Sequence, residues 1–286
     1  VITVIIYIDT HSLHPFLSSY VKELGGGILA AGIVVASYAF FEDFFEIISG
    51  YIMDKLGRRK VFLFLGALGD AVAMLLYSMA GVYKHLIPVR IFHGMTGSMA
   101  GPSIMSLTAD VPHPLARLGA RMGLYGTTII LSVMIGWALG GAIASKMGYS
   151  YLFKVISLML VVSALMALLI VEPEPFLDLE EEEDERKVRF REFMSRLAEL
   201  ASSPGYRVSC IGIFMHMATM GAITVLLPRI IKEEFGLTPM HVALALMAYG
   251  LMALLLQIPM AKAAEKDHGT QTLQDHGFRI LPHSLH

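Results

Sequence analysis

Apolar and polar residues are distributed along the chain in blocks. Short polar stretches separate eight apolar segments: 1–20, 28–51, 61–82, 86–109, 122–145, 151–171, 208–230 and 239–261. Each approaches or exceeds the roughly 20 residues that cross a bilayer. Strand-like alternation is absent, and an open sheet edge in lipid would leave backbone groups without partners, so the segments are predicted to be helices. The pattern therefore predicts an all-α integral membrane protein with eight spans.

Composition agrees with this class. Hydrophobic residues make up 55% of the 286 residues and charged residues 16%, whereas soluble domains have about 45–50% and about 25%. Mean hydropathy is +0.63. The net charge of −2 says nothing about nucleic-acid or acidic partners, and no nucleic-acid partner is predicted. The single cysteine, Cys210, can form no intrachain disulfide. Because the opening residues VITVIIYID are already membrane-like, we expect the natural chain to start earlier.

The cations predict an orientation. Fourteen lysines and arginines follow the even-numbered segments, and six lie in or beside the alternate loops. The positive-inside rule then places the even-numbered loops, and the N-terminus, in the cytoplasm. We therefore expect a multi-pass protein of the cell (cytoplasmic) membrane.

The stretch 172–207 differs from the rest of the chain. It begins with EPEP, continues as the charge run LEEEEDERK, and ends in RFREFMSRLAEL, where apolar residues recur every three or four positions. This predicts a cytoplasmic linker with an amphipathic helix on the membrane surface. It divides a six-helix unit, 1–171, from two further helices, 208–261, and a polar tail, 262–286.

The loop GYIMDKLGRRK is charged although it lies between two apolar segments. Any short cytoplasmic loop can collect lysine and arginine, but here the full spacing of glycines, aspartate and paired arginines is present. It resembles the signature loop that joins the second and third helices of the Major Facilitator Superfamily (MFS). The positions that carry the resemblance are Gly50, Asp54, Lys55, Gly57, Arg58 and Arg59.

Two other segments are similar to family patterns. LIPVRIFHG resembles the fourth helix, with Arg90 and Gly94 in register and His93 where glutamine is usual. The fifth segment resembles the antiporter motif, although Trp137 stands where the family has proline. Its helix-packing glycines are Gly136, Gly140 and Gly141. After the linker, Glu265-Lys266 echoes Asp54-Lys55, which suits two related halves.

The resemblance implies an MFS fold with a complete six-helix N-terminal half and two helices of the C-terminal half. It also implies a rocker-switch mechanism in which the signature loop is a conformational latch. Asp54 would accept backbone amides at a helix N-terminus, and Arg58 would clamp Asp54 in a bidentate pair. Gly50 would allow close helix contact, and Gly57 would permit the turn.

Ionisable residues inside spans are candidate functional groups, because each costs about 2.5–3.5 kcal/mol on insertion scales. Asp9 is a candidate proton carrier or partner of a cationic substrate; alternatively, Thr10 or Ser12 satisfies it. Glu42 and Glu46 are four residues apart and share a helix face. They are candidate proton acceptors lining a cavity, although Glu46 can instead reach the basic loop.

Two further candidates lie in the fourth segment. Arg90 can snorkel outward or pair inward with Asp9 or Asp70. His93 can titrate near physiological pH, or it is a hydrogen-bonded packing residue. Asp70 and His216 are weaker candidates.

No enzyme, cofactor or metal site is predicted. The nineteen methionines are dispersed, which is typical of adaptable packing. The histidines of the tail, His268, His276, His283 and His286, are irregularly spaced. Serines near His93 make an intramembrane serine protease an alternative to consider, but the sequence shows no convincing nucleophile elbow or paired histidine.

The predicted function is a secondary active transporter that uses alternating access, with proton-coupled efflux of an amphipathic or cationic small molecule favoured. Its partners would be that small molecule, protons and the lipid bilayer. A proton-coupled uptake symporter of a metabolite is the alternative. After Lys266 the sequence DHGTQTLQDHGFRILPHSLH is polar, which suggests an out-of-frame ending with C-terminal helices missing. A truncated inactive fragment or membrane sensor therefore stays open.

Overall fold

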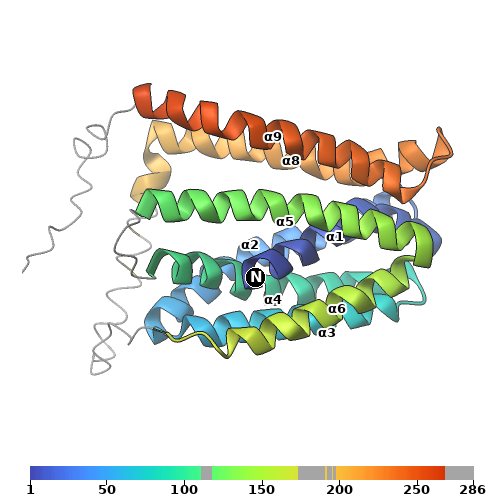
Figure 1. The fold of residues 1–286 in the computed structure, drawn as a ribbon, viewed down its shortest axis with the longest axis horizontal. Helices are drawn as coiled ribbons and strands as arrows, with labels where there is room; N and C mark the ends of the chain where they lie inside the picture. The colour runs from blue at the N-terminus through green and yellow to red at the C-terminus, as the bar shows by residue number, and fades with distance from the viewer. Residues whose placement is uncertain (111–117, 173–190, 192–194, 196–197, 268–286) are drawn as a thin grey trace, which may run out of the picture.

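The computed structural model describes residues 1–110, 118–172, 191, 195 and 198–267. The first half contains α1 (Ile2–Glu23), α2 (Ile28–Leu56), α3 (Arg59–Ser78), the short 3₁₀ helix η1 (Tyr83–His85), α4 (Leu86–Asp110), α5 (Leu118–Met147) and α6 (Tyr149–Ala167). Two more helices follow, α8 (Pro204–Glu233) and α9 (Pro239–Asp267). All eight predicted segments are helical (Figure 1). Most of the predicted surface helix of the linker, and all of the tail after 267, lie outside the described residues.

Six of the described helices are long and apolar enough to cross a membrane: 28–56, 59–78, 123–147, 149–167, 204–233 and 239–256. The protein is therefore a multi-pass membrane protein. The two helices that do not reach this apolarity are α1 and α4. They contain the ionisable residues Asp9, Arg90 and His93, and their crossing of the membrane stays a prediction.

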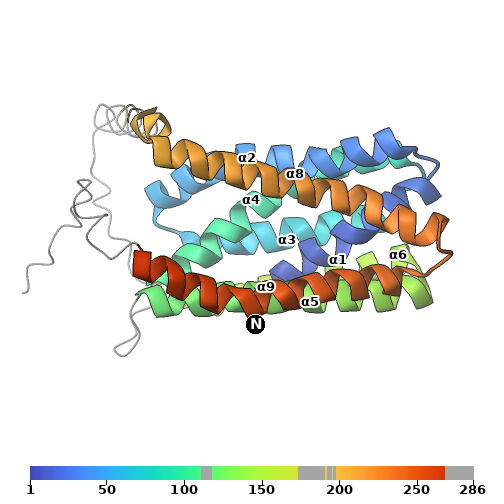
Figure 2. The ribbon, with the colours of Figure 1, turned by 90° about the horizontal axis from the view of Figure 1, so that it is seen from above.

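The helices form a bundle in which neighbours in space are often distant in sequence. α4 packs between α2 and α3, α6 covers α3, and α5 packs along α1. α8 and α9 form an outer layer on one side, where α8 contacts α1 and α9 contacts α5 (Figures 1 and 2). The six-helix unit thus contacts the two helices beyond the linker mainly through α1 and α5, with a smaller contact between α2 and α8.

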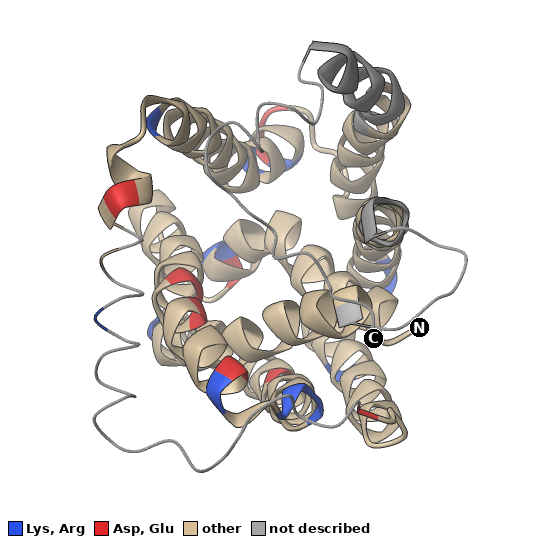
Figure 3. Ribbon diagram, turned by 90° about the vertical axis from the view of Figure 1, so that its left-hand side faces the viewer, with Lys and Arg blue, Asp and Glu red and all other residues tan. Residues whose placement is uncertain are grey.

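Large apolar side chains cover the outside of the bundle. Leu124 and Val208 are each 70% exposed, Leu158 is 67% exposed and Phe40 66%. Seen from the end that bears the α2–α3 loop, the ribbon is mostly uncharged, with isolated charged positions (Figure 3). Contact of such an apolar surface with lipid tails is favourable, whereas its exposure to water is unfavourable.

Glycines allow α1 and α5 to approach each other closely. A Cβ atom at Gly136 would lie 3.0 Å from the carbonyl oxygen of Ile8, and one at Gly140 would lie 2.6 Å from that of Ser12 and 2.7 Å from a ring carbon of Phe16. Small residues bring backbones together in this way in membranes. The predicted packing role of these two glycines agrees with this geometry.

Glycines also allow close approach at other helix contacts. A Cβ atom at Gly94 of α4 would lie 2.7 Å from the Tyr38 carbonyl of α2, and one at Gly141 of α5 would lie 2.6 Å from Cβ of Ala243 on α9. Gly50 differs from the prediction, since a Cβ atom there would meet nothing within 4 Å. In this structure Gly50 mediates no close helix contact among the described residues.

The close contact at Gly140 predicts that a larger side chain at this position destabilises the protein. Gly140→Ala should lower the free energy of unfolding by about 1–3 kcal/mol, the usual cost of overpacking, because the neighbouring atom is backbone. The measurement is the thermal unfolding midpoint of the purified protein in detergent. The matched control is Gly123→Ala on the same helix, whose Cβ would meet no atom. Equal midpoints for both variants would contradict the close packing of α1 on α5.

Candidate functional site

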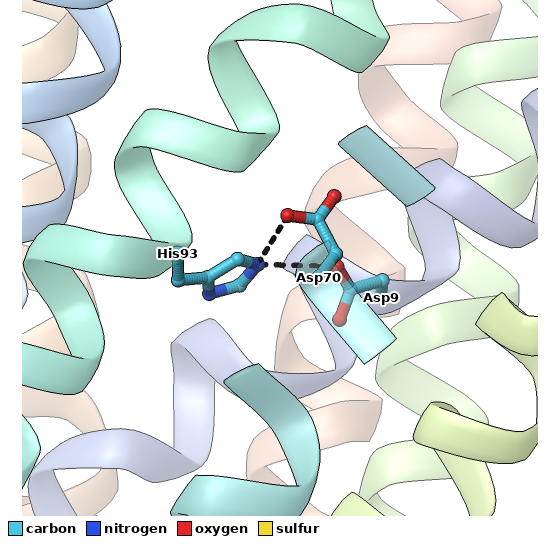
Figure 4. A group of neighbouring side chains, drawn as sticks. All are labelled: Asp9, Asp70 and His93. Carbon is cyan, nitrogen blue, oxygen red and sulfur yellow. Dashed lines mark hydrogen bonds and ion pairs between the residues drawn. The ribbon is translucent and has the colours of Figure 1, made fainter. Parts of the chain in front are cut away.

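Three ionisable side chains from three helices meet in the centre of the bundle. Asp9 comes from α1, Asp70 from α3 and His93 from α4, and all are at most 2% exposed. Nε2 of His93 lies 3.2 Å from Oδ2 of Asp9 and 3.7 Å from Oδ1 of Asp70 (Figure 4). We call these three residues the Asp–His–Asp cluster. It joins two predicted candidates, Asp9 and His93, with the weaker candidate Asp70.

Hydrogen bonds hold two members of the cluster in place. The Thr96 hydroxyl donates to Oδ1 of Asp70 over 2.6 Å, and the Tyr77 hydroxyl lies 3.3 Å from Nδ1 of His93. Asp9 is less satisfied, because its Oδ1 is buried without a hydrogen-bond partner. Ser12 donates to the Asp9 carbonyl, so the expectation that this hydroxyl satisfies the Asp9 carboxyl group is wrong.

Arg90 points inward and is fully buried. Its guanidinium donates to the carbonyls of Val34 and Val35 on α2, over 3.2 and 3.4 Å, and lies 3.4 Å from Nε2 of His14. The guanidinium carbon also sits 4.3 Å from the centre of the Tyr38 ring. The snorkelling alternative is therefore wrong. Among the described residues Arg90 forms no ion pair with either aspartate, and its Nη1 has no hydrogen-bond partner.

A cavity of about 520 Å³ lies beside the cluster. Its lining combines carboxyl groups with tyrosines: Glu42, Glu46, Asp70, Tyr7, Tyr38 and Tyr125. The Tyr38 hydroxyl donates to Oε1 of Glu42 over 2.6 Å, and the hydroxyls of Tyr7 and Tyr125 are 2.9 Å apart. The size lies within the roughly 300–1,000 Å³ of small-molecule sites.

The cavity lining bears on the two alternatives for the glutamates. Glu42 and Glu46 both line the cavity, as their shared helix face predicts. Glu46 lies at its exposed edge, and among the described residues its carboxylate forms no ion pair with the basic loop. Asp70 links the two features, because it belongs both to the cavity wall and to the Asp–His–Asp cluster.

The α2–α3 loop only partly matches the expected latch. Gly57 ends α2 with a φ of 61° and donates to the Met53 carbonyl over 2.9 Å, which is the predicted turn. Asp54 is exposed and makes no ion pair with Arg58 within the described part of the chain. Instead Glu172, beyond α6, accepts the backbone amide of Lys60 at the start of α3 over 2.8 Å.

A group of ion pairs joins α1 to α8 at the opposite end of the bundle. Lys22 pairs with Glu233 over 2.5 Å, and Glu23 pairs with Lys232 over 3.3 Å. Arg229 adds a second contact to Glu233 over 3.1 Å. We call this group the α1–α8 ion pairs. Sequence reasoning assigned none of these residues to a contact, because the partners that join the two helices are about two hundred positions apart.

Sequence reasoning also missed the side chains that position the charged groups. Tyr38 stands four residues before Glu42, a spacing that places both on one helix face, so that contact was recoverable. Tyr77 and Thr96 had no such signal. Their partners lie on another helix, and only packing brings them together.

A strand-free bundle of long apolar helices in the described chain, with ionisable groups at its centre and a cavity beside them, is typical of a polytopic membrane protein. The Major Facilitator Superfamily model matches residues 1–266. The chain belongs to this superfamily.

Curated relatives are similar over parts of the chain. The chain is 27% identical over 174 residues, 61% of its length, to an uncharacterized MFS-type transporter of Methanocaldococcus jannaschii, covering 45% of that protein. It is 26% identical over 140 residues, 49% of its length, to the quinolone resistance protein NorA of Staphylococcus aureus, covering 36% of it. The chain thus spans less than half the length of these relatives.

Solved structures share the fold. A bacterial homolog of the human lysosomal transporter Spinster, in an inward-facing and unoccupied conformation, superposes with a TM-score of 0.71 at 14% identity, covering 88% of this chain and 57% of that one. A D-xylose–proton symporter superposes with a TM-score of 0.64 at 16% identity, covering 93% and 67%. At these identities the likeness shows the fold alone.

The contact of Arg90 with the Tyr38 ring predicts a graded response to substitution. Tyr38→Phe keeps the ring and should cost little beyond the lost Glu42 hydrogen bond, about 0.5–1.5 kcal/mol. Tyr38→Leu also removes the cation–π contact, which adds about 2 kcal/mol for a desolvated pair. Thermal unfolding midpoints in detergent should therefore fall in the order wild type, Phe, Leu. A Leu variant as stable as the Phe variant would show that the ring does not stabilise Arg90.

Proposed function

We propose that the protein is a secondary active transporter that exports an amphipathic cation across the cytoplasmic membrane in exchange for protons. Residues 1–171 form one half of the alternating-access unit, and residues 208–261 begin the other half. The cytoplasmic linker, 172–207, joins them. The signature loop, with Asp54, Lys55, Arg58 and Arg59, acts as a conformational latch in this proposal.

The lining of the cavity carries the proposal. Carboxyl groups of Glu42, Glu46 and Asp70 lie in one small chamber with the rings of Tyr7, Tyr38 and Tyr125. Carboxylates attract a cation, and tyrosine faces bind cations and aromatic rings alike. An amphipathic organic cation presents both features at once.

Proton coupling is supported by the burial of unpartnered charge. Oδ1 of Asp9 and Nη1 of Arg90 are both buried without hydrogen-bond partners. An isolated charge in an apolar interior is costly, so Asp9 would alternate between a bound proton and electrostatic compensation by Arg90. Asp70 would connect this proton exchange to the cavity, because Asp70 lines the cavity and also contacts His93 of the Asp–His–Asp cluster.

The proposed direction and orientation rest on separate observations. Export is supported by the similarity to the quinolone resistance protein, whereas the sugar–proton symporter shares the fold alone and favours neither direction. The cavity is lined by Glu46 and by the C-terminal part of α4, toward the end that bears Gly57. With that end in the cytoplasm, as the cations favour, the α1–α8 ion pairs would close the outer side.

Reconstituted vesicles with an imposed pH gradient test coupling and direction together. A fluorescent aromatic monocation should move against proton flow, and Asp9→Asn should reduce gradient-driven movement to the rate of protein-free vesicles, because an amide cannot carry the proton. The matched control is Asp43→Asn, an exposed carboxyl group of α2, which should keep the wild-type rate. Movement of the cation with protons would overturn the export proposal, and full coupling in Asp9→Asn would remove Asp9 from the mechanism.

Glu42→Gln tests the recognition of positive charge separately. A charge-assisted contact is worth about 1.5–3 kcal/mol, so the KM for the monocation should rise about tenfold or more. The KM for an uncharged analogue with the same ring system should stay within about twofold, since Gln fills the same space. Initial transport rates over a range of concentrations give both values. An equal rise in KM for the two compounds would mean that Glu42 does not recognise the positive charge of the substrate.

A further inference from the structure

The Asp–His–Asp cluster has the composition and spacing of a metal site. One ligand-type atom each from Asp9, Asp70 and His93 lies within 4.8 Å of the other two, and all three side chains are buried. Two neighbouring ligand atoms that each lie about 2.0–2.2 Å from one transition-metal ion are about 3.0–3.6 Å apart. The distances from Nε2 of His93 to Oδ2 of Asp9 and to Oδ1 of Asp70, 3.2 and 3.7 Å, are close to this range. The three residues come from three different helices and converge on one point (Figure 4).

Hydrogen bonds orient the side chains of the cluster, and a bound ion would take the place of the contact between Nε2 of His93 and Oδ2 of Asp9. The Tyr77 hydroxyl contacts Nδ1 of His93, and Nε2 therefore faces the two carboxyl groups. Such a contact to the outer ring nitrogen is the usual way in which a ligating histidine is oriented. Thr96 fixes Asp70, whereas Asp9, which points into the cluster, keeps Oδ1 without any partner. A bound ion would provide the missing interaction.

Charge balance indicates how much positive charge is lacking. The carboxyl groups of Asp9, Asp70 and Glu42 surround this region, and Arg90 is the one buried cation among the described residues that lie there. The other titratable side chains around the cluster add no charge as neutral imidazoles and phenols: His11, His14, His93, Tyr38 and Tyr77. Fully ionised, the three carboxylates exceed Arg90 by two charges. Two protons or one divalent cation would neutralise them.

We propose that Asp9, Asp70 and His93 bind a divalent first-row transition-metal ion, which enters from the cavity past Asp70 and displaces two protons from the carboxyl groups. One imidazole and two carboxylates suit manganese, iron or zinc ions better than soft copper(I) or the all-oxygen preference of calcium. This site goes beyond the proposed function. The organic cation would occupy the chamber beside Glu42, and the metal ion would occupy the wall that Asp70 shares.

Equilibrium binding of Mn²⁺ to the full chain tests the site without any transport assay. The protein is purified in detergent with a tag that lacks histidine, and free Mn²⁺ is followed by electron paramagnetic resonance during titration. Asp9→Asn, Asp70→Asn and His93→Gln should each bind one ion fewer than wild type. Ions bound elsewhere on the chain cancel in this difference. The matched controls are Asp43→Asn and His216→Gln, whose side chains are exposed, and both should retain the wild-type stoichiometry.

Two further measurements keep the test independent of folding in the variants. Tyr77→Phe keeps all three ligands and should weaken Mn²⁺ binding about tenfold, the lower end of the effect of losing a partner of a ligating histidine. In wild type, spin-echo spectra of the bound Mn²⁺ should show nitrogen coupling from one imidazole, which His93→Gln removes. An equal number of bound ions in wild type and in the three ligand variants, with no nitrogen coupling, would overturn the proposal. Transport of the organic cation could still proceed in that case.

Discussion

The cost of charge in a low-dielectric interior constrains everything else in this structure. Asp9, Asp70, Arg90 and His93 are all buried where water cannot solvate them, and each must find its compensation inside the bundle. Backbone carbonyls of α2 and the Tyr38 ring compensate Arg90. The negative charge of the aspartates is compensated less completely, because Oδ1 of Asp9 has no hydrogen-bond partner. Binding of a proton or a metal ion at the centre of the protein would neutralise that charge.

Close helix packing makes this arrangement possible. The glycines that α5 presents to α1, Gly136 and Gly140, set the depth of the helix that carries Asp9. Gly94 seats α4, which carries Arg90 and His93, against the backbone of α2. Polar groups on these helices can meet over hydrogen-bond distances because the backbones stand so near. The contacts between the buried polar side chains therefore depend on the close helix packing that the glycines allow.

The two ends of the bundle are held by different kinds of contact. At one end, exposed ion pairs connect α1 to α8, and such pairs contribute only about 0–1 kcal/mol each in water. At the other end, Glu172 accepts an amide at the start of α3, and the exposed Asp54 makes no pair with Arg58 among the described residues. Weak and reversible contacts between α1 and α8 would suit the proposed alternating access, since strong ones would trap a single state.

The sequence by itself determined the class and much of the local structure. Runs of apolar residues predict helices because lipid offers no hydrogen-bond partners, and the spacing around Gly57 predicts a turn that the structure contains. Helical periodicity also relates Glu42 to Glu46, since neighbours four apart share a face. Only the tertiary structure decided which ionisable groups meet. Asp9 and His93 are 84 residues apart, and their contact depends on the rotation and depth of separate helices, which no periodicity along one helix can specify.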